Sequence, residues 1–594
     1  MVSYYQENIA ACHEQLQAKR PRSRLYGAMR GVTFLCFLAA SYFALTHQAW
    51  VCWLSVAFFA AAFVIFVRCS HNIDKKIGHL QALKNIYEQE LASIVCQQYP
   101  NADGSAFRDP AHPYANDLDI FGDRSLFHLL NRCYTFNGRS YLAGLLQRPP
   151  EDAAHVYLRQ EAIKELCASH RGLIFEALAS LSVKKPHEAS SGENIHSWIQ
   201  QPDKFCLSKP ALLLMHVAPT LNLTLLALAV YNPLFFAALL LFFIPQHIIQ
   251  RRYSKHTRHA KNSLNVIVAD VAGFDVYSST LAEVSFRSSW LQPIQQHIAA
   301  YGQLTPQLQK MLSVFDMGDT FFGSLVKSFL HTSLRTAVKL EKWKKRNRAA
   351  LPHLIEYICE WEALLSFAVF SMNHPTFTFP KILDEDSPTI VEAKELGHPL
   401  IAAEKRISND VAISKNDFFI ITGANMAGKS AFLRTVGINL LLARVGAPVC
   451  ASFFHCTPTQ LFTSMRTADN LDSGLSYFYA EALRFKKMLD FIAAERSVLL
   501  IVDELFRGTN SDDRLKASLA FIRKLAGYSS TSALIATHDL GVTALEKEYP
   551  EKIKSYCFEC ANHDDLLLFD YKLRRGVTRS SNAYLLLQKM HIIS

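Results

Sequence analysis

The sequence predicts a multidomain chain in which an all-α region, interrupted by two apolar helical hairpins, precedes a C-terminal α/β domain. The chain has 594 residues, too many for one ordinary hydrophobic core. Two long apolar runs are each broken by a short polar segment, as a hairpin requires. From about Pro380, long amphipathic stretches give way to short apolar runs that alternate with helical stretches. This alternation is typical of a parallel sheet covered by helices.

The apolar hairpins have the length of membrane-spanning segments. The first occupies about residues 32–67 of an N-terminal helical segment, 1–110, and the second occupies residues 206–252. His47 breaks the first run, and the tripeptide ending at Pro233 breaks the second. Each half has roughly 17 to 20 residues, near the minimum that crosses a bilayer core. We therefore expect four transmembrane helices.

A second interpretation of the hairpins is that they are buried in a soluble core. Pro219, Asn222 and Pro245 favour this alternative for the second hairpin, because such residues weaken a lipid-facing helix.

Basic residues flank both hairpins, whereas the short outer turns carry almost no charge. The flanking residues are Lys19, Arg20, Arg22, Arg24, Arg30, Arg68, Lys75 and Lys76 for the first hairpin, and Lys204, Lys209, Arg251, Arg252, Lys255, Arg258 and Lys261 for the second. Because basic flanks stay on the cytoplasmic side, we expect a multi-pass protein of the cytoplasmic (inner) membrane. Its N-terminus, helical region and α/β domain would lie in the cytoplasm. A cleaved signal peptide is not expected, because about thirty polar and basic residues precede the first apolar run.

The remaining segments divide by their periodicity. Residues 111–205 and 253–385 are amphipathic and poor in glycine, which predicts two parts of one helical region. Residues 386–594 are expected to form the α/β domain.

The composition narrows the class of protein and of partner. Hydrophobic residues make up 50% and charged residues 19% of the chain, which excludes extensive disorder and fits some lipid-facing surface. The net charge of +10 suits a partner rich in phosphate, either nucleic acid or an anionic membrane leaflet. The 13 cysteines show neither a disulfide nor a zinc framework, so we expect reducing surroundings. Cys557 and Cys560, with His563 nearby, fall in an expected strand and are interpreted as structural thiols rather than metal ligands.

A glycine-rich loop follows the expected strand that ends near Ile421. Its residues are Gly423, Ala424, Asn425, Met426, Ala427, Gly428, Lys429 and Ser430, and a helix is expected to follow. This is the context of a Walker A motif, in which backbone N–H groups and the helix N-terminus surround phosphate oxygens. Lys429 would then reach the β- and γ-phosphates of ATP, and Ser430 would bind Mg²⁺.

Two further strand ends complete the expected site. Asp503 and Glu504 follow an apolar strand, as in a Walker B motif, where Asp503 would bind Mg²⁺ and Glu504 would orient or deprotonate water. The pair could instead be a simple helix N-cap. His538 ends a third strand, where it would sense the γ-phosphate, although a lone histidine at such a place is usually structural. Together these residues predict a Mg²⁺-dependent ATPase.

The motifs resemble those of the MutS family of ABC-class ATPases, which act in DNA mismatch repair. The matching tracts are 421–430, 503–510, 536–538, 397–399, 466–481 and 571–576 in the α/β domain, and 123–132 and 159–163 upstream. The resemblance implies a P-loop ATPase domain of the ABC class preceded by the family's core and lever helices. It also implies a homodimer joined through the ATPase domains, in which Ser476 reaches the γ-phosphate held by the other subunit. DNA, mismatched or branched, would be the partner whose binding ATP controls.

The sequence departs from the family pattern in several places. No mismatch-reading domain with its Phe-x-Glu wedge is expected, because the first hundred or so residues form the membrane hairpin. The second hairpin occupies the place of a continuous lever, and no Smr-type nuclease is expected. Arg406 stands where the family places an aromatic ring against adenine, and its guanidinium could stack on the base instead.

Two functions of different classes fit these observations. In the first, a membrane-tethered ATPase couples ATP binding and hydrolysis to DNA binding. In the second, the ATPase moves a protein partner or its own transmembrane helices, without DNA. Two basic stretches, 251–261 and 339–348 with Trp343, could contact DNA phosphates. The first could equally be a membrane flank and the second a solvated helix face.

Overall fold

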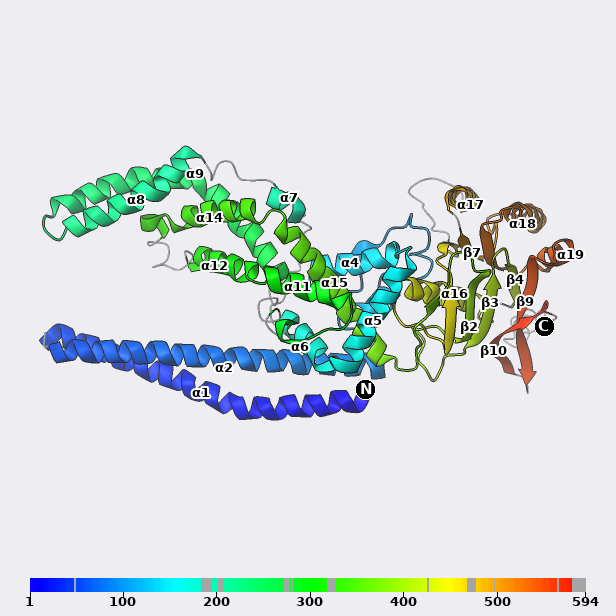
Figure 1. The fold of residues 1–594 in the computed structure, drawn as a ribbon, viewed down its shortest axis with the longest axis horizontal. Coiled ribbons are helices and arrows are strands. Elements are labelled where there is room, and N and C mark those ends of the chain that lie inside the picture. Colours follow the sequence, from blue (N-terminus) through cyan, green and yellow to red (C-terminus); the bar gives the residue numbers. More distant parts are fainter. Residues whose placement is uncertain are drawn as a thin grey trace, which may run out of the picture.

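The computed structural model shows an elongated molecule with a helical N-terminal region at one end and an α/β domain at the other (Figure 1). It describes residues 1–47, 50–182, 195–200, 208–271, 278, 281–317, 327–424, 427–466, 477–495, 497–563 and 566–578. This two-part architecture confirms the coarse fold class predicted from the sequence.

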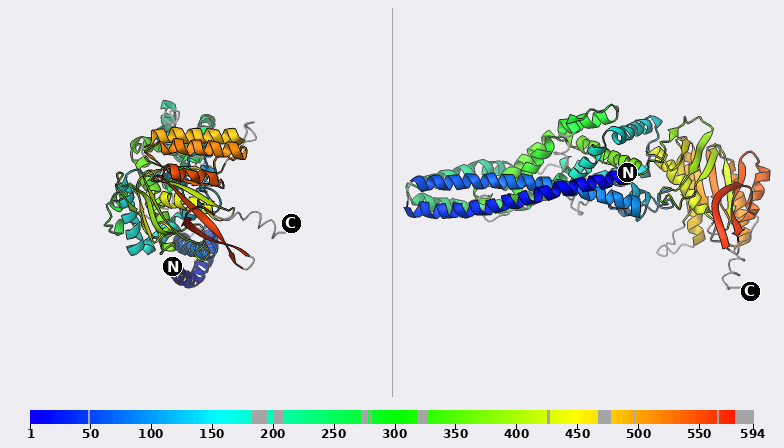
Figure 2. Two further views of the ribbon diagram at one scale, coloured as in Figure 1. Left: turned by 90° about the vertical axis from the view of Figure 1, so that its right-hand side faces the viewer. Right: turned by 90° about the horizontal axis from the view of Figure 1, so that it is seen from below.

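Two very long helices form the N-terminal hairpin. They are α1 (Val2–His47) and α2 (Trp50–Cys96), and at 1.5 Å per residue each is about 70 Å long. Their apolar side chains near the turn are exposed, including Leu45 and Phe58, each with 68% of its surface accessible. At the other end of the hairpin, Tyr5 and Tyr87 are buried and pack around Phe175. The hairpin is therefore anchored at its base, and its apolar part projects freely (Figure 2).

A buried ion pair reinforces this anchor. Arg132 binds the carboxylate of Glu90, a residue of α2, through contacts of 2.5 and 2.9 Å. Asn373 donates to the same carboxylate at 2.8 Å and accepts a hydrogen bond from the Tyr5 hydroxyl at 2.6 Å. The hairpin and the helical region thus share a largely buried polar network.

Shorter helices build the rest of the helical region. They are η1 (Ser105–Phe107), α3 (Leu126–Leu130), α4 (Phe136–Gln147), α5 (Ala153–Ser169), α6 (Arg171–Ser182), α7 (Ile195–Gln200), α11 (Leu291–Tyr301), α12 (Leu304–Met317), α14 (Thr332–Arg346) and α15 (Ala350–Asn373). The central helix α15 is almost entirely buried and packs against α4, α5 and α11. Its C-terminal end leads directly into the first strand of the α/β domain.

The second apolar hairpin consists of α8 (Lys209–Leu228) and α9 (Leu234–Val271). It projects in the same direction as the first hairpin (Figures 1 and 2). Asn222 and Gln246 are buried between its helices and exchange two hydrogen bonds of 2.9 and 3.1 Å. Pro219 has no N–H to donate to the carbonyl of Met215, and Arg335 of α14 donates to that oxygen instead, at 3.4 Å. Asn222, Gln246 and the carbonyl freed by Pro219 therefore have partners.

Three described helices, α1, α2 and α8, are long and apolar enough to cross a membrane. A fourth would be the two segments of α9, Leu234–Gln246 and Ile248–Val268, which meet at a bend of 47°, if they are counted together as one span. Length and composition alone support this count, so the expected four transmembrane helices stay a prediction.

Two sheets form the α/β domain. The strands are β1 (Lys381–Ile382), β2 (Thr389–Leu396), β3 (Asn409–Ser414), β4 (Phe418–Gly423), β5 (Phe453–Cys456), β6 (Gln460–Ser464), β7 (Val498–Asp503), β8 (Thr531–Ala536), β9 (Ile553–His563) and β10 (Leu566–Arg575). Strands in the order β10-β9-β4-β8-β7-β6 form the main sheet, in which only β9 and β10 pair antiparallel. The smaller sheet has the order β1-β5-β2-β3. The carboxyl ends of β4, β7 and β8 meet at one edge of the main sheet.

Helices flank the main sheet and connect its strands. They are α16 (Lys429–Arg444), α17 (Tyr477–Ala494), α18 (Ser511–Ala526), η3 (Leu540–Ala544) and α19 (Leu545–Glu548). β1 pairs with β5, so the domain's first strand lies a few residues before position 386.

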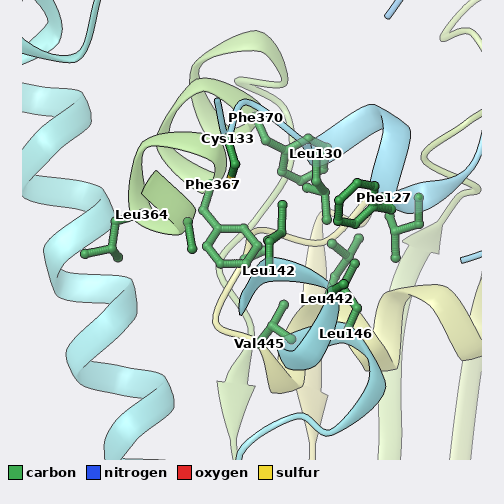
Figure 3. Packing of buried hydrophobic residues seen from close by; sticks show 14 of the residues in the cluster. Phe127, Leu130, Cys133, Leu142, Leu146, Leu364, Phe367, Phe370, Leu442 and Val445 are labelled. Atoms are coloured by element: carbon green, nitrogen blue, oxygen red, sulfur yellow. The ribbon is translucent and has the colours of Figure 1, made fainter. Parts of the chain in front are cut away.

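The two parts of the molecule share one hydrophobic core (Figure 3). Leu442 of α16 and the following Val445 pack in the same cluster as Leu142 and Leu146 of α4 and Phe367 of α15. The helix that begins at the glycine-rich loop therefore ends inside the helical region.

Candidate nucleotide site

The glycine-rich loop connects β4 to α16 in a backbone conformation that only glycine adopts readily. Gly423 and Gly428 have φ angles of 149° and 103°. A Cβ on Gly423 would lie 2.8 Å from the carbonyl oxygen of Phe558, and one on Gly428 would lie 2.9 Å from the ring of Tyr571. The loop is thus held against β9 and β10. Asn425 and Met426, which we expect to contact the phosphates, lie outside the described residues.

Lys429 is a buried cation that lacks a carboxylate partner among the described residues. Only 5% of its surface is exposed, and its Nζ donates to the carbonyl oxygens of Gly423 at 2.6 Å and Ala424 at 3.0 Å. Burial lowers the pKa of its amine, and the nearby Asp503 and Glu504 partly oppose that shift. A buried cation without a counter-ion fits an anionic phosphate group, which would stabilise its charge.

Ser430 and Asp503 lie together at the junction of α16 and β7. The Ser430 hydroxyl donates to Asp503 Oδ2 at 2.5 Å. A hydroxyl and a carboxylate at this distance are the oxygen donors that Mg²⁺ takes beside nucleotide phosphates, so the residues present fit the metal. When bound there, Mg²⁺ would neutralise charge that develops on the phosphates.

Glu504 follows Asp503 in a left-handed conformation, with φ of 64°. Such a conformation costs a non-glycine residue roughly 1–3 kcal/mol, and it turns the carboxylate out of the strand direction. The carboxylate lies 3.4 Å from Arg507 Nε and 3.7 Å from Arg514 Nη1. Two arginines therefore hold the expected general base at the edge of the cavity.

His538 lies opposite, just beyond β8, with its Nε2 3.4 Å from Lys429 Nζ. Burial lowers the pKa of His538, and the positive charge of Lys429 lowers it further. The imidazole is therefore neutral near pH 7, where one ring N–H can donate to a phosphate oxygen.

These groups surround one cavity of about 720 Å³. Its lining includes Ala424, Ala427, Gly428, Lys429, Ser430, Asp503, Glu504 and His538. The structure thus brings together the described Walker A residues, the Walker B pair and the strand-end histidine, which together span more than a hundred residues of the sequence. The volume and the mixed lining are typical of a small-molecule site.

Arg406, the residue expected to stack on adenine, is packed beside the cavity. Its guanidinium donates twice to the carbonyl of Ile401, at 3.0 and 2.7 Å, and lies 5.3 Å above the ring of Phe377. Arg406 does not line the cavity, whereas its neighbour Ile407 does. In this arrangement its donors are occupied by Ile401, so the contact of Arg406 with adenine stays a prediction.

Sequence reasoning assigned no role to Tyr571 or Arg507, and both line the cavity. Tyr571 is 43% exposed, and its aromatic ring lies beside Gly428. Arg507 contacts both Walker B carboxylates and donates to the Asp503 carbonyl. The tracts 503–510 and 571–576, which resemble the MutS family, contain these residues. Only the fold shows which residues of the two tracts face the cavity.

Ser476, which we expect to act across a dimer, lies outside the described residues. The helix that follows it, α17, buries Glu481 under the Walker B turn, where its carboxylate accepts the Arg507 N–H at 3.3 Å. Burial raises the pKa of this carboxyl, and the backbone N–H groups of residues 506–508 oppose that shift. The expected signature segment is therefore tied to the nucleotide site at its C-terminal side.

On its N-terminal side, the same segment is tied to the helical region by two acidic residues. Asp117 accepts from the Thr463 hydroxyl at 2.6 Å, and Asp119 binds Arg466 with contacts of 2.6 and 2.9 Å. Arg434, one turn into α16, donates to the carbonyl of Asp117 at 3.1 Å. One loop of the helical region thus contacts both the P-loop helix and the strand that precedes the signature segment.

The expected cysteine pair shows no site in the described residues. Cys557 is buried in β9, where burial raises the pKa of its thiol. The side chains of Cys560 and His563 lie outside the described part of the chain.

Comparison with known proteins identifies the domain that holds this cavity. Residues 419–589 match the family model of MutS domain V. The chain is 30% identical over 250 residues to the DNA mismatch repair protein MutS of Staphylococcus aureus (strain MRSA252), covering 41% of this chain and 28% of that protein. It is 32% identical over 259 residues to the DNA mismatch repair protein MutS of Aquifex pyrophilus, covering 42% and 28%.

The DNA mismatch repair protein MutS of Acetivibrio thermocellus is 32% identical over 211 residues, which are 34% of this chain and 24% of that protein. The chain thus spans about a quarter of the length of these curated relatives. The matched region contains the glycine-rich loop, both Walker B carboxylates and His538. The C-terminal domain of this chain therefore belongs to the MutS domain V family.

Proposed function

We propose that this protein is a membrane-tethered, Mg²⁺-dependent ATPase that couples ATP binding and hydrolysis to the binding of mismatched or branched DNA. The observation that carries the proposal is the convergence of Lys429, the Ser430–Asp503 pair, Glu504 and His538 on one cavity. The match to MutS domain V and to proteins named for DNA mismatch repair supports the DNA part.

Three residues of this chain would have different roles in hydrolysis. Lys429 would leave the carbonyls of Gly423 and Ala424 for the phosphates, because a charged acceptor binds an ammonium more strongly than a neutral one. Glu504 would exchange an arginine contact for the attacking water. Neutral His538 would donate a hydrogen bond to the phosphate that is released.

The exposed apolar helices support the tether. The hairpins α1–α2 and α8–α9 project in parallel away from the α/β domain, and their apolar side chains are widely exposed. Exposed apolar surface of this extent is typical of contact with lipid. The basic flanks would place the ATPase domain at the cytoplasmic face of the inner membrane.

The experiment for the coupling is a gel-shift titration of the purified full chain with homoduplex, mismatched and branched DNA, with and without Mg-ATP. We expect affinity for at least one DNA to change with ATP and to fall steeply with salt. Lys429→Ala should remove the ATP response and leave the salt dependence intact. The proposal would be contradicted if the chain bound none of these DNAs, or if Mg-ATP changed its affinity for none of them.

A second candidate is an ATPase that moves its own hairpins or a protein partner, without DNA. One observation favours it: the enclosed Glu90–Arg132–Asn373 network joins α2 to the end of α15, which leads into the ATPase domain. ATP-dependent change in the accessibility of a cysteine placed near the hairpin turn, with no DNA binding, would support this candidate instead.

A homodimer joined through the ATPase domains is part of the proposal. Phe478 and Tyr479 at the start of α17 have 41% and 51% of their surface accessible. They lie within the expected signature segment and suit such an interface. Light scattering of the Glu504→Gln variant with Mg-ATP should show the dimer, because uncleaved nucleotide would hold the two domains together.

A further inference from the structure

A second cavity, of about 290 Å³, lies at the base of the α8–α9 hairpin, between α9, α12 and the first turn of α14. Three cations line it: Arg258 and Lys261 of α9, and Lys327. No acidic side chain lines it among the described residues, although Asp316 binds Lys261 from outside at 2.8 Å. In the described part of the chain, Arg258 and Lys327 have no carboxylate within 4.0 Å. The cavity is therefore built for a negative charge.

The N-terminus of α14 adds to this positive field. Ser333 and Leu334, the second and third residues of this 15-residue helix, line the cavity. No side chain caps the helix, because the residue before it, His331, adopts a left-handed conformation with φ of 50° and makes no capping bond. The first N–H groups of an α-helix have no partner within the helix, and they carry a partial positive charge. Such a terminus readily binds an anion.

An orphaned hydroxyl points to a ligand independently of the charges. Ser333 is 4% exposed, and its Oγ has no hydrogen-bond partner. A buried hydroxyl without a partner costs about 1–3 kcal/mol, and native proteins rarely keep one without a reason. A phosphate oxygen in the cavity would accept its proton. Gln250, on the opposite wall, also has a buried amide oxygen without a partner, and its amide can turn to present N–H groups instead.

The position of the cavity indicates the source of the anion. The exposed apolar side chains of α9, which include Ile244, Ile248 and Ile249, run directly up to Gln250, where the cavity begins. An acyl chain along that face would bring its headgroup to the cavity. The volume suits a single phosphate-bearing headgroup and is far too small for a duplex.

We propose that this cavity binds the phosphate group of an anionic phospholipid of the cytoplasmic leaflet, held by Arg258, Lys261, Lys327, the Ser333 hydroxyl and the N-terminus of α14. The proposal rests on the membrane tether of the proposed function and is independent of its DNA part. It makes the α9–α14 junction a lipid-recognising element beside the helices that lead to the ATPase domain.

The test is native mass spectrometry of the full chain in a neutral detergent, with phosphatidylglycerol or phosphatidylcholine added. We expect one phosphatidylglycerol to bind in preference to phosphatidylcholine. The double variant Arg258→Gln/Lys327→Gln should weaken that binding about tenfold or more, since each basic contact with an anionic headgroup contributes substantially. The matched control is Arg251→Gln/Lys255→Gln, which removes equal charge from exposed positions of α9 that do not line the cavity.

Ser333→Ala separates binding from folding. It should weaken phosphatidylglycerol binding several-fold, while the thermal midpoint of the lipid-free protein stays the same or rises, because an unsatisfied hydroxyl is removed. Equal loss of binding in the cavity and control variants would overturn the proposal, as would equal affinity for the two lipids. The lipid assignment would be overturned if inorganic phosphate or duplex DNA bound in the cavity and phosphatidylglycerol did not.

Carbonate extraction of membranes tests the membrane tether separately from lipid binding in the cavity. A chain that leaves the membrane fraction would contradict the tether itself. A chain that stays in the membrane but binds both lipids alike would contradict only the cavity proposal.

Discussion

At the residue scale, Glu504 is the side chain whose role is most sharply defined. Its left-handed backbone turns the carboxylate toward the cavity, and Arg507 and Arg514 hold it there. Glu504→Gln keeps the shape and removes the base, so ATP turnover should fall by about 10²–10⁴-fold while ATP still binds. Phosphate release and nucleotide filter binding measure the two effects.

The control for this substitution is Glu546→Gln, which removes a carboxylate that pairs with Arg575 away from the cavity. It should leave turnover unchanged. If Glu504→Gln hydrolysed ATP at the normal rate, the carboxylate would have no part in activating water.

A second residue-scale prediction concerns the base of the nucleotide. Tyr571 lines the cavity with an exposed ring, whereas Arg406 is bound to Ile401 and Phe377 outside it. Loss of an aromatic stacking partner costs about 1–3 kcal/mol per base. Tyr571→Ala should therefore weaken ATP binding about 5- to 100-fold, Tyr571→Phe should retain it, and Arg406→Ala should change it little. Fluorescent-nucleotide titration measures these affinities. A large loss of binding for Arg406→Ala and a small one for Tyr571→Ala would instead support the role expected of Arg406.

At the scale of elements, the second hairpin depends on a polar contact inside an apolar segment. Asn222 and Gln246 satisfy each other, and Asn222 also donates to the carbonyl of Phe329 at 2.9 Å. Asn222→Leu would remove the acceptor of the buried Gln246 amide N–H, leaving Gln246 only its 3.3 Å contact with His331, at a cost of about 1–3 kcal/mol. We expect the thermal midpoint in detergent to fall clearly for this variant.

The double variant Asn222→Leu/Gln246→Leu provides the control for this pair. Replacing both partners by apolar groups of similar size should restore part of the lost stability. A double variant less stable than the sum of the single variants would show that the pair has another role.

The periodicity of the sequence predicts these elements well, because helices and buried strands leave clear patterns. The strand ending at Gly423, the helix after Lys429 and the strand ending at Asp503 are present. The contacts between distant elements are harder to predict. The local sequence pattern does not reveal that Arg335 donates to the Met215 carbonyl, which Pro219 leaves without a helical donor. It also does not reveal that Arg406 lies over the ring of Phe377. Such pairings depend on the tertiary packing of segments that are separate in the sequence.

The basic stretch 339–348 illustrates the same limit. Its exposed residues are Lys339, Lys342, Lys345, Arg346 and Arg348, which remain candidates for phosphate contact. Trp343 and Lys344 are buried, and Lys344 is paired with Glu341 at 2.9 Å. Composition alone could not separate the solvated face of α14 from its packed face.

At the scale of the whole molecule, the candidate nucleotide site and the two apolar hairpins lie at opposite ends of one connected body (Figure 1). The shared hydrophobic core at Leu442 and Val445, and the contacts of Asp117 and Asp119, join the P-loop helix to the helical region. Continuous packing therefore connects the cavity to α15 and the hairpins, so a conformational change at the cavity can be transmitted along these contacts. Coupling along this route still requires that ATP and DNA, or ATP and lipid, prefer different arrangements of these elements.

Both proposed functions require that the cavity around Lys429 and Asp503 hydrolyses ATP with Mg²⁺. The most direct test is the rate of phosphate release by the purified full chain, compared with Lys429→Ala and with chelated Mg²⁺. We predict release that requires Mg²⁺ and falls at least about a hundredfold in the variant, as expected for loss of a buried charge on the phosphates. Release at the same rate from Lys429→Ala, or without any divalent metal, would contradict the claim.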